Sequence, residues 1–185
     1  MNDQNRSDYP FIVFGMGCFW GAEKRLSEVP GVIDVESGYA GGDSQDATYK
    51  EVLALEKALQ MGLAEQRNHA EVIKVSYNPQ QVDLETLLAH FWQNHNPTQG
   101  DRQGNDVGSN YRSVIYYQTE EEKHLACLSL EKYQTALRQH GFGKITTEIT
   151  ELRNYNRAEE YHQDYLQKNP FGYCGLGGTG IPYPD

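Results

Sequence analysis

The stretch FIVFGMGCFWG, residues 11–21, decides the fold of this chain. Its apolar beginning is typical of a buried strand, and Gly15-Met16-Gly17 interrupts that run before Cys18. The following residues 22–26, AEKRL, favour a helix. We therefore expect Cys18 at the first turn of a helix, just beyond the edge of a sheet. The free amides and dipole of a helix N-terminus stabilise an anion, which lowers the pKa of a thiol placed there.

The chain has three cysteines, Cys18, Cys127 and Cys174, and no C-x-x-C pair, so neither a zinc site nor a thioredoxin motif is indicated. By itself Cys18 suits a reactive thiol or a buried structural cysteine, and both interpretations stay open. Cys174 lies among glycines, where a mobile backbone lets a thiol reach a second sulfur. Cys127 lies in the helical segment 125–128, LACL, and we expect an inert core thiol.

The length and charge suit an acidic single domain. Its 185 residues carry 16 Lys and Arg against 26 Asp and Glu, a net charge of −10, which argues against partners such as nucleic acid or anionic membranes. The start of the chain is polar, and no apolar run approaches the length of a membrane span. We expect one catalytic domain over 1–185 in a cytoplasmic monomer, with a flexible N-terminus at 1–9 and a glycine-rich mobile tail at 171–185.

Segments with strand and helix patterns alternate along the chain, which predicts an α/β or α+β domain of two layers. The expected strands after the first are 32–38, 69–77, 113–117 and 144–150, and the expected helices after the first are 48–67, 84–94, 120–140 and 157–168. In the helix 48–67, Leu55, Leu59 and Leu63 recur at the spacing of one apolar face. The polar stretch 95–110 is longer than a simple connection and suits a functional loop.

Several side chains are candidates for proton transfer and hydrogen bonding. Glu71 begins an apolar strand, where burial raises the pKa of a carboxyl, although an outward-facing, solvated glutamate also fits the pattern. Tyr39, Tyr111 and Asp106 lie in or beside polar loops and can contact a polar oxygen or remain ordinary rim residues. His162 is expected to be a partly buried helix residue without a catalytic role.

Six segments, taken together and in order, resemble the peptide methionine sulfoxide reductases of the A type, and the resemblance covers residues 11–180. The segments are GCFWG at 17–21, GYAGG at 38–42, HAEV at 69–72, RQGND at 102–106, YRS at 111–113 and NPFGYCG at 169–175. The resemblance implies an α/β (α+β) two-layer plait, with helices packed on a mixed sheet and a long irregular C-terminal segment.

The resemblance also implies a role for each site residue in the reduction of methionine-S-sulfoxide. Cys18 attacks the sulfoxide sulfur, and Phe19 and Trp20 form the pocket for the S-methyl group. The remaining residues face the polar side of the substrate: Glu71 as proton donor, Tyr39 and Tyr111 as hydrogen-bond donors to the sulfoxide oxygen, and Asp106 as a polar substrate-site residue. A thiol attack of this kind needs a neighbouring acid because an unprotonated sulfoxide oxygen leaves poorly.

The implied cycle continues through a sulfenic acid on Cys18 and a Cys18–Cys174 disulfide, which thioredoxin reduces. No metal or bound cofactor is required. The implied substrates are oxidised proteins, peptides and free methionine sulfoxide.

Two departures from the family pattern stand out. The stretch 53–68 is longer and more helical than the usual short turn before His-Ala-Glu, and 180–183 lacks the second recycling cysteine of many members. A thiol peroxidase that uses Cys18 and Cys174 is the competing enzyme, and a redox-controlled binding domain is the non-enzymatic alternative.

Overall fold

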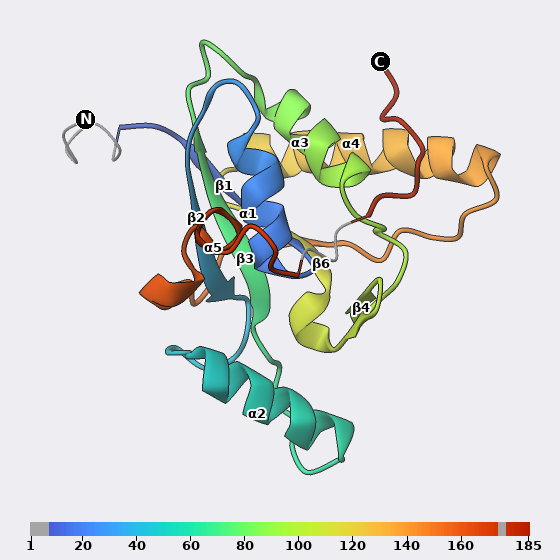
Figure 1. The fold of residues 1–185 in the computed structure, drawn as a ribbon. Helices are drawn as coiled ribbons and strands as arrows, with labels where there is room; N and C mark the ends of the chain where they lie inside the picture. The colour runs from blue at the N-terminus through green and yellow to red at the C-terminus, as the bar shows by residue number, and fades with distance from the viewer. Residues whose placement is uncertain (1–7, 174–176) are drawn as a thin grey trace.

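The apolar run at the front of the chain forms β1 (Phe11–Met16), an interior strand of a six-stranded mixed sheet (Figure 1). The structure is a computed structural model that describes residues 8–173 and 177–185. The other strands of this sheet are β2 (Val32–Ala40), β3 (Ala70–Tyr77), β6 (Ser113–Tyr117), β7 (Glu148–Glu151) and β8 (Asn156–Arg157). Their order is β7-β6-β1-β3-β2-β8, antiparallel throughout except for the parallel pair β6–β7. A separate hairpin joins β4 (Arg102–Gln103) to β5 (Asp106–Val107).

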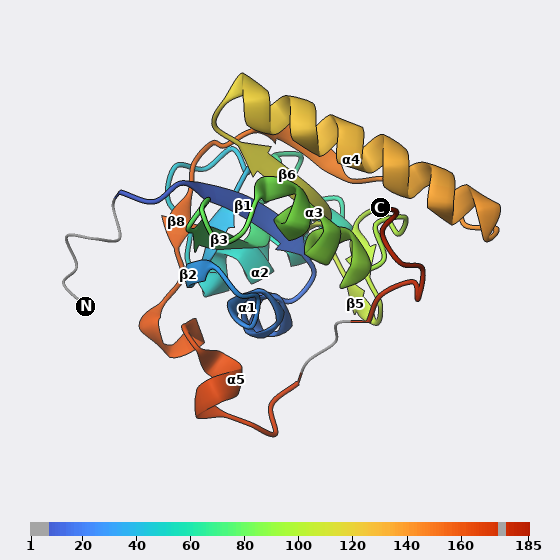
Figure 2. The same ribbon diagram turned by 90° about the horizontal axis from the view of Figure 1, so that it is seen from above.

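The chain also forms helices and short helical turns. They are α1 (Phe19–Ser27), α2 (Tyr49–Gln60), α3 (Leu84–Gln93), η2 (Ser109–Tyr111), α4 (Glu120–Gln139), η3 (Glu160–His162) and α5 (Tyr165–Lys168). Figure 2 shows α4 and α5 on opposite sides of the molecule, with the sheet and α1 between them. The predicted mixed α/β architecture is confirmed. The predicted helix 157–168 is wrong in detail, because η3 and α5 are two short pieces separated by Asp164, which has a positive φ of 52°.

The main core lies between the sheet and three helices, α1, α3 and α4. Phe14 of β1 meets Phe91 of α3 with ring centroids 4.8 Å apart, and Trp92 donates to Ser129 of α4 across 2.9 Å. On the other face, Val13, Val72 and Val114 are fully buried with partly buried side chains of the irregular connection 152–155 against them. Because β1 is covered on both faces, its sequence reads as a continuous apolar run without alternation.

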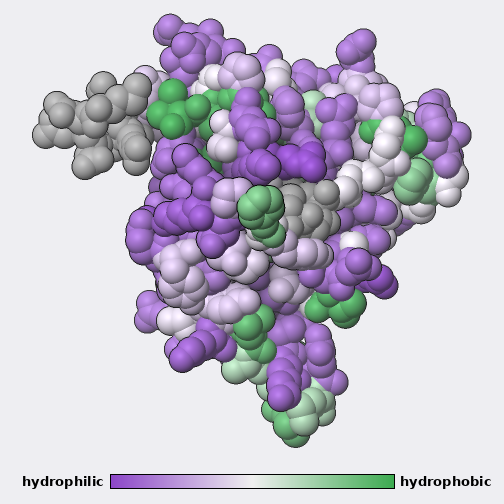
Figure 3. All heavy atoms as spheres, in the orientation of Figure 1, coloured by the Kyte–Doolittle hydropathy of each residue, from purple (hydrophilic) through white to green (hydrophobic). Residues whose placement is uncertain are grey.

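Helix α2 projects from the rest of the domain, as Figure 1 shows. Thr48 forms a capping box with Glu51, and the helix ends at Gln60, short of the expected Arg67. Its buried side chains are Val52 and Glu56, whereas Leu63 is 74% exposed. The predicted leucine face holds only in part: Leu55 and Leu59 are half-buried, whereas the buried side chains lie along a neighbouring line of the helix. Helix α2 and the turn after it carry apolar side chains among polar ones on the surface (Figure 3), and the exposed ones are Leu53, Met61 and Leu63.

Cys127 is exposed on α4, so its prediction as a core thiol is wrong. The buried face of this helix includes Ala126, Ser129, Tyr133 and Leu137, spaced three and four residues apart. Cys127 lies one position beyond Ala126, and a rotation of about 100° per residue turns it outward.

The end of the tail that we expected to be mobile is bound to the helices. The Tyr133 hydroxyl lies 2.8 Å from Thr179 Oγ1 and donates to the carbonyl of Ile181, and the Tyr183 amide donates to Gln93 of α3. Within the described part of the chain, no helix is both long enough and apolar enough to cross a membrane.

Candidate active site

Cys18 lies at the junction between β1 and α1. Gly17 has a positive φ of 96°, a conformation that favours glycine and turns the chain out of the sheet and into the helix. Cys18 is the N-cap residue of α1 and is only 8% exposed. Burial raises the pKa of its thiol from 9.0 to about 12, the nearby charge of Glu71 adds to this, and the backbone amide of Trp20 opposes it. The expected lowering of the Cys18 pKa is therefore wrong for the substrate-free site.

Glu71 lies in β3, opposite Tyr39 of the neighbouring strand β2. Its side chain is 2% exposed, and its Oε1 accepts a hydrogen bond of 3.3 Å from the backbone amide of Phe19. Burial raises the pKa of Glu71 to about 8, against the opposing effect of that amide. Of the two interpretations open from the sequence, the structure shows the buried one, and the carboxyl carries a proton at neutral pH.

A cavity of about 60 Å³ opens beside these two groups. It is lined by Cys18, Phe19, Trp20, Tyr49, Glu71, Asp106, Tyr111 and Tyr173. The residues come from α1, the start of α2, β3, the β4–β5 hairpin and the turn η2, with Tyr173 from the C-terminal segment. Six of the eight candidate residues thus lie around one cavity. Cys174, the next candidate, lies outside the described residues.

Tyr39 is the candidate that the structure does not bring to the cavity. Its side chain is fully buried, and its hydroxyl donates to Oε1 of Glu159 across 3.1 Å. Tyr49, the first residue of α2, lines the cavity instead, and its backbone amide also donates to Glu159. Burial, followed by the charge of Glu71, raises the pKa of both Tyr49 and Tyr111, so both phenols stay protonated donors. The helix-start pattern at Thr48-Tyr49 is the sequence signal that could have identified Tyr49.

His162 holds the indole of Trp20 in place. Trp20 Nε1 donates to His162 Nδ1 across 3.0 Å, and Tyr165 stacks on the indole at 3.7 Å between ring centroids. His162 is 2% exposed in η3, and burial lowers the pKa of its imidazole. The neutral ring accepts at Nδ1 and therefore carries its proton on Nε2, which faces Glu159 at 3.7 Å. The sequence had indicated an ordinary helix residue, and nothing local in the sequence pairs His162 with Trp20.

Tyr173 and Asp106 meet at the mouth of the cavity. The Tyr173 hydroxyl donates to Asp106 Oδ2 across 3.4 Å, and Tyr173 is half exposed. Burial raises the pKa of Asp106, while the Tyr173 hydroxyl opposes that rise. The C-terminal segment therefore reaches the site just before Cys174.

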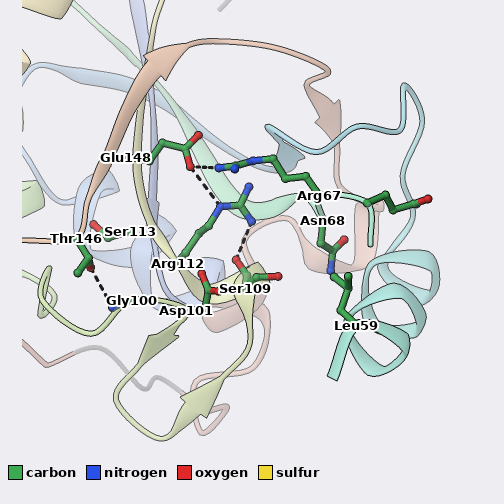
Figure 4. Close-up of a pocket in the computed structure, with 11 residues that line it drawn as sticks. Leu59, Arg67, Asn68, Gly100, Asp101, Ser109, Arg112, Ser113, Thr146 and Glu148 are labelled. Carbon is green, nitrogen blue, oxygen red and sulfur yellow. Dashed lines mark hydrogen bonds and ion pairs between the residues drawn. The ribbon is translucent and has the colours of Figure 1, made fainter. Parts of the chain in front are cut away.

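A larger hollow of about 330 Å³ lies elsewhere, between the end of α2 and residues 100–113. Figure 4 shows Arg67 and Arg112 turned toward Glu148, which pairs with both guanidinium groups. Its lining contains no thiol, and its cations already have an anion. Among residues 8–173 and 177–185, no cluster of three His, Cys, Asp or Glu side chains forms a metal site.

The cavity beside Cys18 combines a thiol, a neutral carboxylic acid and two phenol donors with an apolar wall of Phe19 and Trp20. In such a set the thiol can attack a polarised centre that carries an oxygen. The phenols can hydrogen-bond that oxygen, the carboxylic acid can protonate it, and the apolar wall can hold a small alkyl group. The acid is buried, so bulk water does not compete for its proton.

Known proteins are similar to this chain in sequence and in fold. The family model described as peptide methionine sulfoxide reductase matches residues 11–179. The mitochondrial peptide methionine sulfoxide reductase of Homo sapiens is 49% identical over 186 residues, covering 97% of this chain and 75% of that protein. Methionine sulfoxide reductase A of Corynebacterium diphtheriae superposes with a TM-score of 0.76 at 39% identity, covering 95% and 82% of the two chains. Mxr1 of Saccharomyces cerevisiae in complex with Trx2 has a TM-score of 0.54 at 25% identity, covering 86% of each chain.

Proposed function

Because the chain belongs to the peptide methionine sulfoxide reductase family, we propose that the Cys18 cavity is where it reduces methionine sulfoxide to methionine. The family is one of oxidoreductases, and the match over most of the chain argues against the thiol peroxidase alternative. The observation that carries the assignment of the site is the buried Glu71, whose pKa of about 8 keeps it an acid beside the thiol.

We infer the following reaction from the groups that line the cavity. The Cys18 sulfur attacks the sulfoxide sulfur while Glu71 gives its proton to the sulfoxide oxygen and the hydroxyls of Tyr49 and Tyr111 hydrogen-bond that oxygen. The S–O bond of the substrate breaks, the oxygen passes to Cys18 as a sulfenic acid, and methionine leaves. The thiol proton of Cys18 restores Glu71. The sulfur of the substrate is reduced and the sulfur of Cys18 is oxidised by two electrons, so no metal or bound cofactor takes part.

The apolar wall selects one face of the substrate. Phe19 is 1% exposed and fixed between Tyr39 and His162, and Trp20 is held by His162 and Tyr165. Such a rigid wall accepts the S-methyl group in one orientation, with the oxygen toward Glu71. We assign the S epimer at sulfur to this orientation, for sulfoxide in proteins, in peptides and in the free amino acid.

Recycling proceeds through Cys174. The described segment before it already reaches the site, because Tyr173 contacts Asp106. A thiol there condenses with the sulfenic acid, releases water and leaves a Cys18–Cys174 disulfide. Mxr1 of yeast is known in complex with Trx2, which supports thioredoxin as the dithiol that reduces this bond.

The test uses racemic and separated sulfoxide epimers of a methionine peptide with dithiothreitol as reductant. We expect the racemate to stop near half conversion and only the S epimer to be consumed. Cys18→Ser is expected to be inactive, and Cys174→Ser is expected to form one methionine per chain and then fail to turn over with thioredoxin. Full conversion of the racemate at one rate, or turnover by Cys18→Ser, would contradict the proposal.

A further inference from the structure

Glu56 is a buried carboxylate outside the cavity, on the projecting helix α2. It is 9% exposed and faces away from solvent toward η2, the turn that ends in Tyr111. The ion pairs found in the described part of the chain do not include Glu56. A carboxylate placed there needs hydrogen-bond donors, since an unpaired buried charge is costly.

Two segments of the chain supply those donors. The backbone amide of Ser109 donates to Glu56 Oε1 across 2.8 Å, and the Ser109 hydroxyl donates to Oε2. From the other side, Asn68 Nδ2 donates to Oε2 across 3.1 Å. Burial alone would raise the pKa of Glu56, but the hydrogen bonds from Ser109, then Asn68 and Gln60, outweigh it and lower the pKa. The charged form of Glu56 is therefore the form that these contacts stabilise.

Each donor lies close in sequence to a group that acts in the cavity. Ser109 is two residues before Tyr111, and the Tyr111 amide closes the turn by donating to the carbonyl of Gly108 across 3.0 Å. Asn68 is three residues before Glu71, and it is tied to α2 a second time by donating to the carbonyl of Val52 across 3.0 Å. One carboxylate thus joins the segment before the acid to the segment before the phenol.

The turn around Ser109 leaves little room to relax. Gly108 has a positive φ of 147°, and a Cβ built on it would lie 2.4 Å from Asn110 Oδ1 and 3.3 Å from Glu56 Cγ. Arg112 secures the same turn by donating from Nη1 to the carbonyl of Ser109 across 2.8 Å, a contact visible in Figure 4. A packed turn of this kind transmits the position of its anchor to the next side chain.

We propose that Glu56 is a positioning residue, which fixes the Tyr111 hydroxyl relative to Glu71 by clamping Ser109 and Asn68 together. This inference rests on the proposed roles of Tyr111 and Glu71 at the sulfoxide oxygen. It assigns a task to helix α2 within the longer stretch before Glu71. Helix α2 supports the site through Glu56, and its exposed apolar side chains take no part in these contacts.

The experiment measures single-turnover methionine formation from a sulfoxide peptide for Glu56→Ala, Tyr111→Phe and the double variant. A misplacement of about 1 Å in a catalytic group can cost about 10²-fold in rate. We expect Glu56→Ala to lower the rate constant by about 10- to 100-fold, with the half-saturating substrate concentration within about threefold of wild type. In the Tyr111→Phe background the same substitution should add less than about threefold, because coupled residues are not additive.

Controls separate this role from a general loss of structure. Glu65→Ala removes an exposed carboxylate just after α2 and should leave the rate unchanged. Alkylation of Cys18 by chloroacetamide should proceed at the same rate in wild type and Glu56→Ala. If Glu56→Ala does not fold, Ser109→Ala is measured by the same criteria, and Ser109→Thr should restore the rate because it keeps the hydroxyl.

The outcomes are distinguishable. A rate for Glu56→Ala within twofold of Glu65→Ala, or losses that add fully with Tyr111→Phe, overturns the positioning role while the proposed function stands. A normal rate in Tyr111→Phe itself overturns the assigned role of Tyr111 and the clamp together. A large, non-additive loss in Glu56→Ala with intact Cys18 alkylation supports the inference.

Discussion

The backbone amide of Phe19 donates to Oε1 of Glu71 across 3.3 Å, which joins the first turn of α1 to the strand β3. This amide is one of the free donors at the helix N-terminus, and it is used on the acid. Burial and the charge of Glu71 then dominate the thiol, so the pKa of Cys18 rises to about 12 in spite of its place at the helix start. The resting site therefore holds two protons, one on Cys18 and one on Glu71.

The rate of the chemical step should fall as pH rises through about 8, where Glu71 loses its proton. Glu71→Gln should abolish this dependence and slow the step by about 10²- to 10⁴-fold, the usual contribution of a general acid. Single-turnover methionine formation between pH 5 and pH 10 measures both effects. Because the Glu71 charge raises the Cys18 pKa, alkylation of Cys18 should move to lower pH in Glu71→Gln. A near-normal rate in Glu71→Gln would show that a group other than Glu71 donates the proton.

Stability should also depend on Glu71. The folded-state pKa of about 8 lies above the ordinary value of 4.5, so between these values the folded chain keeps a proton that the unfolded chain has lost. The free energy of unfolding therefore falls as pH rises across this window, and the stability from neutral Glu71 is fully present only below about pH 4.5. Urea unfolding at pH 5, 6.5 and 8 should show a smaller decline for Glu71→Gln. An equal decline of the free energy of unfolding with pH in the two proteins would contradict the conclusion that Glu71 is buried as a neutral acid.

Substitutions of Tyr49 and Tyr39 should affect different properties of the protein. Tyr49→Phe removes a hydroxyl from the cavity wall and should slow methionine formation by about tenfold, the effect of about one lost hydrogen bond. Tyr39→Phe removes the donor to Glu159 and should lower the denaturant midpoint while the rate of the chemical step stays within about threefold of wild type. The reverse pattern, a slow Tyr39→Phe beside a normal Tyr49→Phe, would restore the role that the family resemblance implied for Tyr39.

Cys127 should be an accessible bystander. It is exposed on α4, whereas Cys18 is 8% exposed, so a bulky thiol reagent should modify Cys127 rapidly in the native protein. Cys127→Ser should lose one rapidly reacting thiol and keep wild-type turnover with thioredoxin. Counting fast-reacting thiols against the fully unfolded protein checks the first point, and a turnover assay checks the second. Loss of turnover with the fold intact would show that the helix cysteine takes part in recycling.

The local sequence determined the elements that surround the site. The strand, glycine turn and helix at 11–21 follow from composition and spacing, whereas the apolar run after His69 left both a buried and a solvated Glu71 open. The α/β or α+β two-layer arrangement followed from the alternation of strand and helix patterns. Cys18, Phe19, Trp20, Glu71, Asp106 and Tyr111 were chosen as a set from short motifs that resemble the family, and all six line the cavity.

Tertiary structure decided the features that depend on side-chain direction and on partners distant in sequence. Tyr39 and Tyr49 are ten residues apart, and only the hydrogen bond to Glu159 shows which hydroxyl is occupied. Cys127 lies outside the core because successive side chains on a helix differ in direction by about 100°. The Cys18 pKa depends on burial and on the charge of Glu71, 53 residues away in the chain, and Glu56 meets Ser109 at the same separation. Propensity and periodicity act over a few residues, whereas desolvation and hydrogen-bond partners are set where the folded chain brings distant segments together.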